Sequence, residues 1–314
     1  MVTTPTMADR DGFIWMDGKM VDWRDAKIHV LTHTLHYGLG VFEGVRAYKT
    51  HDGRTAIFRL EDHTKRLVNS AKIFQLNVPY SYEVILEAQK AIIRDNKLES
   101  AYLRPLIWVG SEKLGIAAKD NTIHTMVAAW VWGAYLGEEG MAKGIRVKTS
   151  SYTHHLPNVT MCKAKAVSNY PVSIMSNAEV TRNGYDEAVL MDPEGFVCQG
   201  SGENLFMVKD GELHTPDLSG GALDGITRRT VIQFANDLGI KVHERRITRD
   251  EFYLADEVFM TGTAAEITPI REYDDRVIGK GARGEITEKL QNLFFDVVHG
   301  KNDKYAHWLS YVDE

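Results

Sequence analysis

The sequence has only two cysteines, Cys162 and Cys198, among its 314 residues. Two cysteines are too few for the disulfide framework of a small secreted domain. Neither lies in a CxxC pair or in the Cys/His spacing that is typical of a metal site. We therefore expect two structural thiols, no metal site, and a protein of the reducing cytoplasm.

Long apolar runs and a strong excess of one charge sign are also missing. No stretch approaches the ~18 apolar residues of a membrane span, and the first segment, MVTTPTMADRDGFIWMDG, has acidic residues and no apolar core typical of a signal peptide. The formal net charge of −6 gives no reason to expect an anionic partner. We expect neither nucleic acid nor a membrane as a partner.

The overall composition is that of an ordinary globular protein, with 44% hydrophobic and 25% charged residues. The length favours two domains or one large domain. The sequence contains no internal repeat and no low-complexity tract. A sizeable hydrophobic core is therefore expected.

The first block of the chain mixes helix and strand patterns and ends near Trp132. Apolar residues at steps of three and four predict helices in EDHTKRLVNSAKIF and SYEVILEAQKAIIRDNKL, whereas TAIFRL, AYLRPLIWVG and HTMVAAWVWG are typical of strands. The next segment, GAYLGEEGMAKG, has four glycines in twelve residues and is the best linker candidate. These patterns predict domains at 1–132 and 142–314, joined by an interdomain loop at 133–141.

The second block adds hairpins to helices. A helix is predicted in KAKAVSNYPVSIMSNAEVTRNG, ending at Gly184, with Pro171 in its first turn or at a kink. DEAVLMDPEGFVCQG and NLFMVKDGELHTP carry the turns DPEG and KDGE of antiparallel hairpins. GITRRTVIQFANDLG and GEITEKLQNLFFDVVHG indicate further helices, and EVFMTGTAAEITPI a strand that enters a turn of small residues. Without a regular βαβ alternation, the expected class is α+β and not a Rossmann fold.

Two lysines in PNVTMCKAKAVSNYP, Lys163 and Lys165, are the most unusual charges in the chain. Most lysines are solvated surface charges. Here no acidic residue lies between Lys148 and Glu179, and the neighbours are mostly small or apolar. Desolvation would favour a neutral amine, which attacks carbonyl groups in Schiff-base enzymes. On a helix, residues two apart diverge by about half a turn, so only one of the two would reach a site.

The motifs together are similar to those of one family. The sequence resembles the branched-chain amino acid aminotransferases, pyridoxal-phosphate enzymes of fold type IV, over essentially its whole length. The matching stretches are HTLHYGLGVFEGVRAY, HTKRLVNSAKIF, AYLRPLIWVG, WGAYLG, KAVSNY, GSGENLF, LDGITR and YLADEVFMTGTAAEITPI. The resemblance implies a two-domain α+β fold like that of D-amino-acid aminotransferase. In it a small N-terminal α/β domain holds the substrate side-chain pocket, and a larger, antiparallel β-rich domain binds the cofactor.

The resemblance also implies pyridoxal 5′-phosphate (PLP) as the cofactor. Lys165 opens the K-x-x-x-N-Y run and is assigned as the Schiff-base lysine and general acid–base, which leaves Lys163 without a catalytic role. Arg66 is implied as a phosphate clamp, although without the family it would be taken for a helix-surface cation. The cofactor-binding residues that the resemblance implies are Arg66, Tyr170, Gln199, Leu223, Gly225, Ile226, Thr227, Gly262 and Thr263.

The implied reaction is a ping-pong transamination of L-leucine, L-isoleucine and L-valine with 2-oxoglutarate and L-glutamate. Arg104, an arginine within an apolar strand, is implied to bind the side-chain carboxylate of glutamate. Tyr37, Leu114 and Ile116 would reach the pocket of a partner subunit, so a homodimer or higher homo-oligomer is expected. The substrate-binding residues that the resemblance implies are Tyr37, Phe42, Gly44, Tyr102, Arg104, Leu114, Ile116, Trp132, Tyr135 and Ala264.

One position departs from the family pattern. Members usually have a glutamate five residues before the asparagine of N-L-F, where its carboxylate holds a proton on the cofactor's ring nitrogen. In CQGSGENLF that position is Gln199. Three interpretations are open: natural tolerance, an engineered or attenuated variant, or lost catalysis. The functional alternatives are a D-amino-acid aminotransferase or aminodeoxychorismate lyase of the same fold, or a catalytically attenuated PLP-binding protein.

Overall fold

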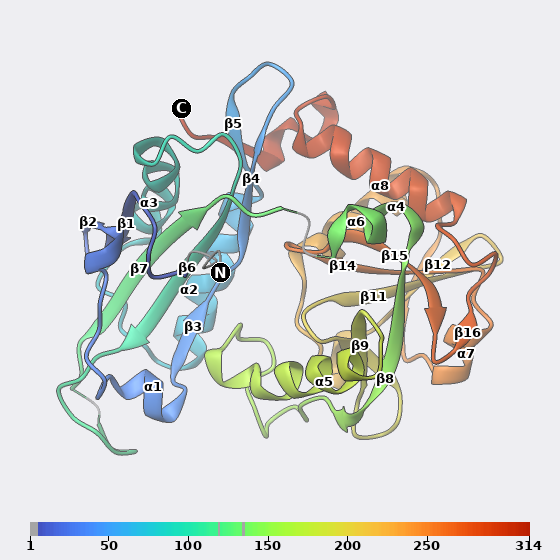
Figure 1. The fold of residues 1–314 in the computed structure, drawn as a ribbon, viewed down its shortest axis with the longest axis horizontal. Coiled ribbons are helices and arrows are strands. Elements are labelled where there is room, and N and C mark those ends of the chain that lie inside the picture. The colour runs from blue at the N-terminus through green and yellow to red at the C-terminus, as the bar shows by residue number, and fades with distance from the viewer. Residues whose placement is uncertain (1–5, 119, 134–135) are drawn as a thin grey trace, which may run out of the picture. The chain divides into compact units, whose positions relative to one another are not determined.

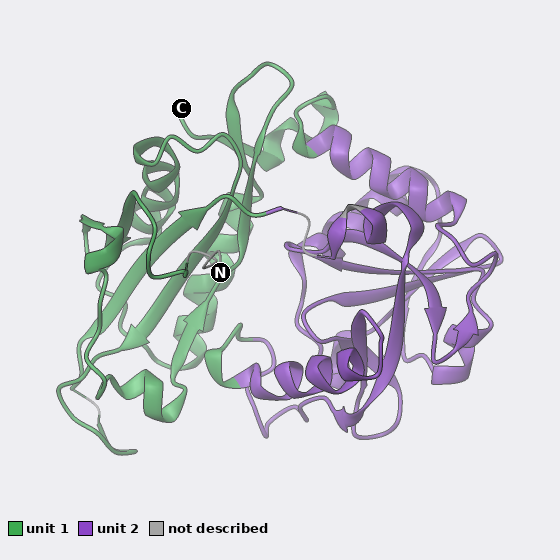
Figure 2. Cartoon of the chain, in the orientation of Figure 1, with its two compact units in different colours: residues 1–132, 164–168, 298–314 green, residues 133–163, 169–297 purple. Residues whose placement is uncertain are grey.

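The computed structural model describes residues 6–118, 120–133 and 136–314. The chain divides into two compact units, shown in Figure 2. Unit 1 comprises residues 1–132, 164–168 and 298–314, and unit 2 comprises residues 133–163 and 169–297. The short segment 164–168, which contains Lys165, thus packs with unit 1 although the chain on both sides of it belongs to unit 2.

Unit 1 is built on an antiparallel sheet. Its strands, within the described ranges, are β1 Phe13–Met16, β2 Lys19–Asp22, β3 Gly40–Phe42, β4 Val45–Lys49, β5 Thr55–Phe58, β6 Ala101–Val109, β7 Ile123–Trp130 and β17 Leu309–Tyr311. They lie in the order β17-β5-β4-β6-β7-β1-β2, and β3 also pairs with β6. The strands predicted in TAIFRL, AYLRPLIWVG and HTMVAAWVWG are confirmed as β5, β6 and β7.

Helices α2 Leu60–Ile73 and α3 Tyr82–Asp95 pack on the sheet of unit 1 (Figure 1), and both were predicted. In α3 the apolar residues Ile85, Ala88 and Ile92 recur on one face and are buried, because a step of three or four residues returns to the same side of a helix. Ser81 caps this helix, since its Oγ accepts a hydrogen bond from the Val84 N–H. A short helix, α1 His33–Tyr37, precedes β3.

Unit 2 is built on a mixed sheet. Its strands, among the described residues, are β8 Ile145–Thr153, β9 Glu187–Met191, β10 Val197–Gly200, β11 Asn204–Lys209, β12 Glu212–Pro216, β13 Val242–Arg245, β14 Glu257–Gly262, β15 Glu266–Tyr273 and β16 Arg276–Val277. The predicted hairpins are confirmed as β9–β10 and β11–β12. The sheet is mostly antiparallel, but β8 lies parallel to β9 and β15, and β12 lies parallel to β13. The expected α+β class is confirmed.

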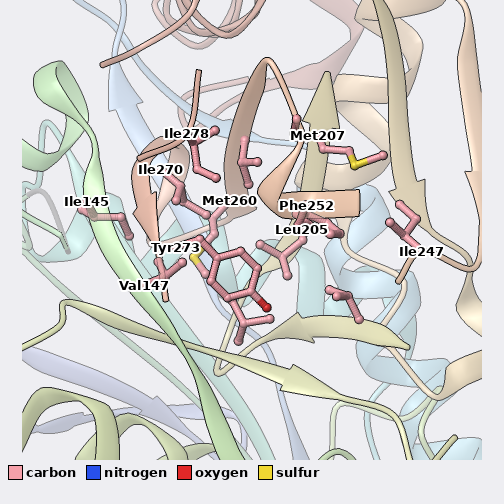
Figure 3. Close-up of a cluster of buried hydrophobic side chains, with 14 residues drawn as sticks. Ile145, Val147, Leu205, Met207, Ile247, Phe252, Met260, Ile270, Tyr273 and Ile278 are labelled. Atoms are coloured by element: carbon pink, nitrogen blue, oxygen red, sulfur yellow. The ribbon is translucent and has the colours of Figure 1, made fainter. Parts of the chain in front are cut away.

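The helices of unit 2 are α4 Gly137–Lys143, α5 Pro171–Arg182, α6 Ile226–Asp237, α7 Arg249–Tyr253 and α8 Glu285–Val298, the last of which ends at the border with unit 1. The core of this unit is a cluster of buried apolar side chains from several strands and α7, including Leu205, Phe252, Met260 and Tyr273 (Figure 3). Among the described residues, no helix is long and apolar enough to cross a membrane. The glycine-rich segment after Gly133 contains α4, so part of the linker candidate is helical.

The helix predicted from Lys163 begins later than expected, at Pro171. Proline fits the first helical position because the N–H it lacks would have no partner there. Upstream, the backbone is already engaged elsewhere, since Ala166 bridges to Val41 and the Lys165 carbonyl accepts a hydrogen bond from the Phe42 N–H. The predicted end is confirmed, with Gly184 in the left-handed region just after Arg182.

Candidate active site

Lys165 is held by its backbone on both sides. Its N–H donates to Ser70 Oγ at 3.1 Å, and its carbonyl oxygen accepts from the Phe42 N–H at 3.0 Å. The ammonium Nζ lies 5.0 Å from the centre of the Phe42 ring, and the neighbouring Ala164 and Ala166 are buried. This arrangement fixes the half-buried Lys165 side chain beside an aromatic face.

Lys163 has different surroundings. It is exposed and belongs to unit 2, where its Nζ donates to the Leu218 carbonyl oxygen at 2.8 Å. The desolvation that the sequence suggested for both lysines therefore does not apply to Lys163. Its surface position agrees with a residue that has no part in catalysis.

Arg66 forms a buried ion pair instead of an exposed one. Its Nε and Nη2 donate to the two carboxylate oxygens of Glu43 at 2.6 and 2.9 Å, and the Glu43 side chain has no exposed surface. His63 also contacts Glu43, with Nδ1 2.7 Å from Oε2. Burial would raise the pKa of the Glu43 carboxyl, but the charges of Arg66 and His63 and their hydrogen bonds outweigh it and hold that pKa well below its usual range.

Sequence reasoning missed Glu43 and His63. The signal for Glu43 was present in GVFEGV, where a single acidic residue stands among apolar residues and glycines. Such a carboxylate needs a cation or several donors if the strand is buried. His63 gave no comparable signal, because a histidine at the start of an amphipathic helix is ordinary.

Arg104 lies on β6 among aromatic rings. Its guanidinium carbon is 4.8 Å from the centre of the Phe42 ring and 5.5 Å from that of Tyr102, whose hydroxyl accepts a long hydrogen bond of 3.5 Å from Nη2. Its Nε is buried without a hydrogen-bond partner, and no described residue forms an ion pair with it. A cation that is partly enclosed without an anion is costly. The site therefore fits an anionic ligand.

Two tryptophan rings pack against Tyr102, the neighbour of Arg104. The Tyr102 ring contacts the rings of Trp130 and Trp132, with centroids 5.3 and 4.6 Å away. Gly44 is required beside them, because a Cβ at this position would lie 2.0 Å from the Tyr102 hydroxyl. The structure thus brings the predicted Phe42 and Tyr102 beside Arg104, with the predicted Gly44 and Trp132 next to Tyr102, and it adds Trp130.

In unit 2, Gln199 is linked to the loop that leads into α6. This buried side chain on β10 accepts a hydrogen bond from the Leu223 N–H through Oε1, at 3.0 Å. The Leu223 carbonyl in turn accepts from Asn204 Nδ2 at 2.9 Å. Gly225 is the N-cap of α6, and a Cβ there would lie 2.0 Å from Asn204 Oδ1. The loop is therefore fitted tightly against β11.

The start of α6 has the features of an anion site. No side chain caps the helix, and Ile226 and Thr227 form its first turn with backbone N–H groups that have no partner within the helix. Gly262, Thr263 and Ala264 lie at the end of β14 and in the turn to β15, and all three are half-buried. Tyr170 is the N-cap residue of α5 and is also half-buried.

Three of the remaining predicted pocket residues lie at the surface. Tyr37 on α1 and Leu114 and Ile116 in the loop after β6 are exposed, Ile116 by 99%. The loop is tied to α1, because the His33 ring Nε2 lies 3.1 Å from the Gly115 carbonyl oxygen. Tyr135 lies outside the described residues.

One group of side chains in the described part of the chain has metal-ligand geometry, namely Glu212, His214 and His243 on β12 and β13. Each of the three side chains already has a protein partner. Glu212 Oε1 accepts a hydrogen bond from Lys241 Nζ at 3.2 Å, and Glu212 Oε2 lies 2.7 Å from His243 Nε2. His214 Nδ1 accepts a hydrogen bond from Arg245 Nε at 3.2 Å. The expectation of no metal site stays a prediction.

Both cysteines are buried free thiols. Burial, which disfavours the thiolate, raises the pKa of Cys198. A thiol held in its neutral form is a poor nucleophile. This agrees with the structural role that the sequence suggested.

Comparison with known proteins gives consistent results. The amino-transferase class IV family matches residues 40–273. The chain is 55% identical over 307 residues to the branched-chain-amino-acid aminotransferase of Pseudomonas aeruginosa, a match that covers 98% of this chain and 99% of that protein. The crystal structure of the Escherichia coli branched-chain amino acid aminotransferase matches with a TM-score of 0.94 and 44% identity, covering 96% of this chain and 100% of that one.

A further structure carries a ligand. The T.th. branched-chain amino acid aminotransferase complexed with N-(5′-phosphopyridoxyl)-L-glutamate matches with a TM-score of 0.91 and 45% identity, over 96% of this chain and 99% of that one. These relatives do not support the D-amino-acid aminotransferase or aminodeoxychorismate lyase alternatives. The chain belongs to the branched-chain amino acid aminotransferase family, within the class IV aminotransferases.

Proposed function

We propose that this chain transfers the amino group of L-leucine, L-isoleucine and L-valine to 2-oxoglutarate, with PLP as the cofactor. The family assignment supports the reaction, and the phosphopyridoxyl-glutamate bound to the T.th. relative supports both the cofactor and the amino donor. The reaction is a ping-pong exchange in which one amino acid leaves as its keto acid before the second keto acid binds.

The residues present fit PLP. The uncapped start of α6, with Thr227 in its first turn, suits a phosphate group, and Arg66 supplies a planar cation. The buried amide of Gln199 suits a ring nitrogen as a hydrogen-bond partner. When bound, the cofactor supplies an electron sink for the pair of electrons left on the substrate α-carbon.

Lys165 is the proposed attachment lysine and the general acid–base. Its Nζ accepts the proton that leaves the substrate α-carbon, and later returns a proton. The two backbone hydrogen bonds of Lys165 and the Phe42 ring fix the direction of the side chain, so that the amine needs little reorganisation between these steps. Tyr170 is proposed to bond the cofactor's phenolic oxygen, and Leu223, Gly225, Ile226, Gly262 and Thr263 to line its site.

One observation supports dual substrate recognition, namely that Arg104 lies among aromatic rings without an acidic partner. The aromatic side chains suit the apolar side chain of leucine, isoleucine or valine. The guanidinium suits the second carboxylate of glutamate or 2-oxoglutarate. An aminotransferase that uses glutamate as donor needs both kinds of contact in one pocket, and Ala264 is proposed to bind the shared α-carboxylate.

The test is the Arg104→Ala variant assayed with each substrate. We expect the KM for glutamate and 2-oxoglutarate to rise by about tenfold or more, the scale of one charge-assisted hydrogen bond, whereas the KM for leucine changes little. Arg54→Ala is a matched control, because Arg54 belongs to the same unit and its guanidinium pairs with Asp52 and Glu314 at the surface. An equal rise for leucine would show that Arg104 maintains the fold or binds the α-carboxylate.

We further propose a homodimer or higher homo-oligomer in the cytoplasm. The exposed apolar side chains of Tyr37, Leu114 and Ile116 support this assembly, because His33 contacts both Tyr37 and Gly115 of the loop, and exposed apolar patches are typical of contact surfaces. Sedimentation of the wild type and of an Ile116→Asp variant would test it. A wild-type monomer with full activity would contradict the assembly.

A further inference from the structure

Glu43 stands at the end of β3, between the residues that hold Lys165 and Arg66. The preceding residue, Phe42, donates its N–H to the Lys165 carbonyl, while the Glu43 side chain binds the Arg66 guanidinium. On α2, Ser70 lies one turn after Arg66 and accepts the Lys165 N–H. The attachment lysine and the cation on α2 are therefore held by the same two elements.

The contact between Glu43 and Arg66 fixes the orientation of the Arg66 guanidinium. A side-on pair through Nε and Nη2 uses two of the five N–H groups of the guanidinium, and sets the plane of the fork. The other N–H groups then point away from Glu43. A lysine at position 66 would not give this fixed plane, because its ammonium is a point charge.

The other contacts of Glu43 keep the carboxylate in place. His63 is buried, and its ring Nδ1 lies 2.7 Å from Oε2, which holds this carboxylate oxygen in place. The Gly44 N–H donates to the same oxygen at 3.2 Å, and the Glu43 N–H donates to the Pro105 carbonyl at 2.9 Å. The formal charges of Glu43 and Arg66 cancel within their ion pair.

We propose that Glu43 is a positioning residue, which aims the Arg66 guanidinium at the cofactor phosphate and fixes it relative to Lys165. The inference rests on the proposed role of Arg66 and Lys165 in PLP binding. Because Glu43 offsets the charge of Arg66, the clamp acts through directed hydrogen bonds and not through a net positive charge. Loss of Glu43 should therefore harm binding of the phosphate group and not of the pyridine ring.

The test compares PLP with pyridoxal, which lacks the phosphate. The loaded enzyme is equilibrated with equal concentrations of both compounds, the bound compound is fixed with borohydride, and the ratio on the protein is measured by mass spectrometry. The variants are Glu43→Gln, Arg66→Ala and the double variant. Glu99→Gln is the matched control, since Glu99 has an exposed ion pair with Lys49 in the same unit.

We expect Glu43→Gln to lower the PLP-to-pyridoxal ratio by about tenfold or more, as one charge-assisted contact would, and Glu99→Gln to leave the ratio unchanged. In the Arg66→Ala background, Glu43→Gln should lower it no further, because Glu43 acts through Arg66. A Glu43→Gln variant with the wild-type ratio, or a further loss in the double variant, would overturn the inference.

Failure of the proposed function gives a different result. If Arg66→Ala keeps the wild-type ratio, Arg66 is not a phosphate ligand, whatever Glu43 does. If Glu43→Gln does not fold, Glu43→Asp keeps the charge but draws the carboxylate back by one methylene. A lowered ratio in that variant supports the positioning role, and a wild-type ratio contradicts it.

Discussion

Lys163 and Lys165 stand two residues apart in the sequence, yet their surroundings are opposite. The charge pattern of the segment is the same for both, and it did not distinguish them. The difference comes from distant residues: Phe42 and Ser70 bond the backbone of Lys165, whereas Lys163 reaches the Leu218 carbonyl at the surface. A residue's chemistry is thus set here by contacts far away in the sequence.

We therefore expect Lys165→Ala to abolish both transamination and the visible absorbance of bound PLP, because an alanine side chain has no amine to attach the cofactor or to move the proton. Lys163→Ala should keep most of both, since its exposed side chain contacts a backbone carbonyl. Absorbance spectra and a coupled assay of leucine with 2-oxoglutarate measure the two effects. Equal losses in both variants would show that the assignment of Lys165 has no basis.

A second prediction concerns Gln199, which stands where members of the family usually have a glutamate. Gln199→Glu keeps an oxygen that can accept the Leu223 N–H, so the loop before α6 should be preserved. If the residue faces the ring nitrogen, a carboxylate stabilises the protonated ring, and turnover rises by about tenfold for each ~1.4 kcal/mol of added transition-state stabilisation.

Burial sets a condition on that gain. A glutamate buried without a cationic partner would take up a proton and give no benefit. Turnover and PLP content measured together distinguish the two cases. Normal PLP content without faster turnover would mean that the site has adapted to an amide, or that the ring nitrogen meets another residue.

At the scale of elements, periodicity predicted α2, α3 and the two hairpins, because their patterns are local. It did not predict the start of α5, since the backbone of residues 165 and 166 is bound by β3, which is more than 120 residues away in the sequence. The parallel pairs β8–β9 and β12–β13 were also not predicted, because pairing partners leave no mark on a strand's own pattern.

The start of α6 allows a prediction for an element. Gly225→Ala places a methyl group against Asn204, whose side chain holds the Leu223 carbonyl, so the first turn of the helix must shift. We expect a loss of stability of about 1–3 kcal/mol, typical of overpacking, and weaker retention of PLP in dialysis. Gly202→Ala is the control, because nothing lies within 4 Å of a Cβ there and its φ is not positive.

A Gly225→Ala variant with wild-type melting temperature and PLP retention would show that Asn204 moves aside at no cost. In that case the close fit of this loop against β11 does not matter for the anion site at the start of α6. The experiment therefore tests how the start of α6 is packed, and not the chemistry of one side chain.

At the scale of the whole molecule, each unit depends on acidic groups that are enclosed by partners from several elements. The resemblance gave the two-domain architecture, and composition gave a globular class, but neither indicated which charges are buried. Glu43 is a buried acidic residue of unit 1, and Asp274 is one of unit 2. Asp274 follows β15 and is hydrogen-bonded to residues of β8 and α7. The GVFEGV pattern marks Glu43 only if its strand is buried, and the burial of Asp274 likewise depends on partners from other elements.

The hydrogen bonds of Asp274 allow a prediction of how the stability of unit 2 depends on pH. Its carboxylate accepts hydrogen bonds from the Thr149 N–H at 2.8 Å, the Tyr253 hydroxyl at 2.7 Å and Arg249 Nη2 at 2.6 Å. Burial raises the pKa of Asp274, but these bonds outweigh it and lower the pKa below the usual value. The stabilising effect is therefore complete above the unfolded-state pKa of about 3.9 and is lost as the pH falls through the lower folded-state pKa.

Asp274→Asn removes this titration while keeping the backbone, because asparagine tolerates the positive φ of 48° at this position. We expect a lower urea midpoint at pH 7 and a smaller fall below pH ~4 than in the wild type. Asp210→Asn is the matched control, since Asp210 also has a positive φ but is exposed in the turn between β11 and β12. If circular dichroism gives the wild type and Asp274→Asn the same midpoints at both pH values, the Asp274 network does not stabilise unit 2, and acid sensitivity must come from other carboxylates such as Glu43.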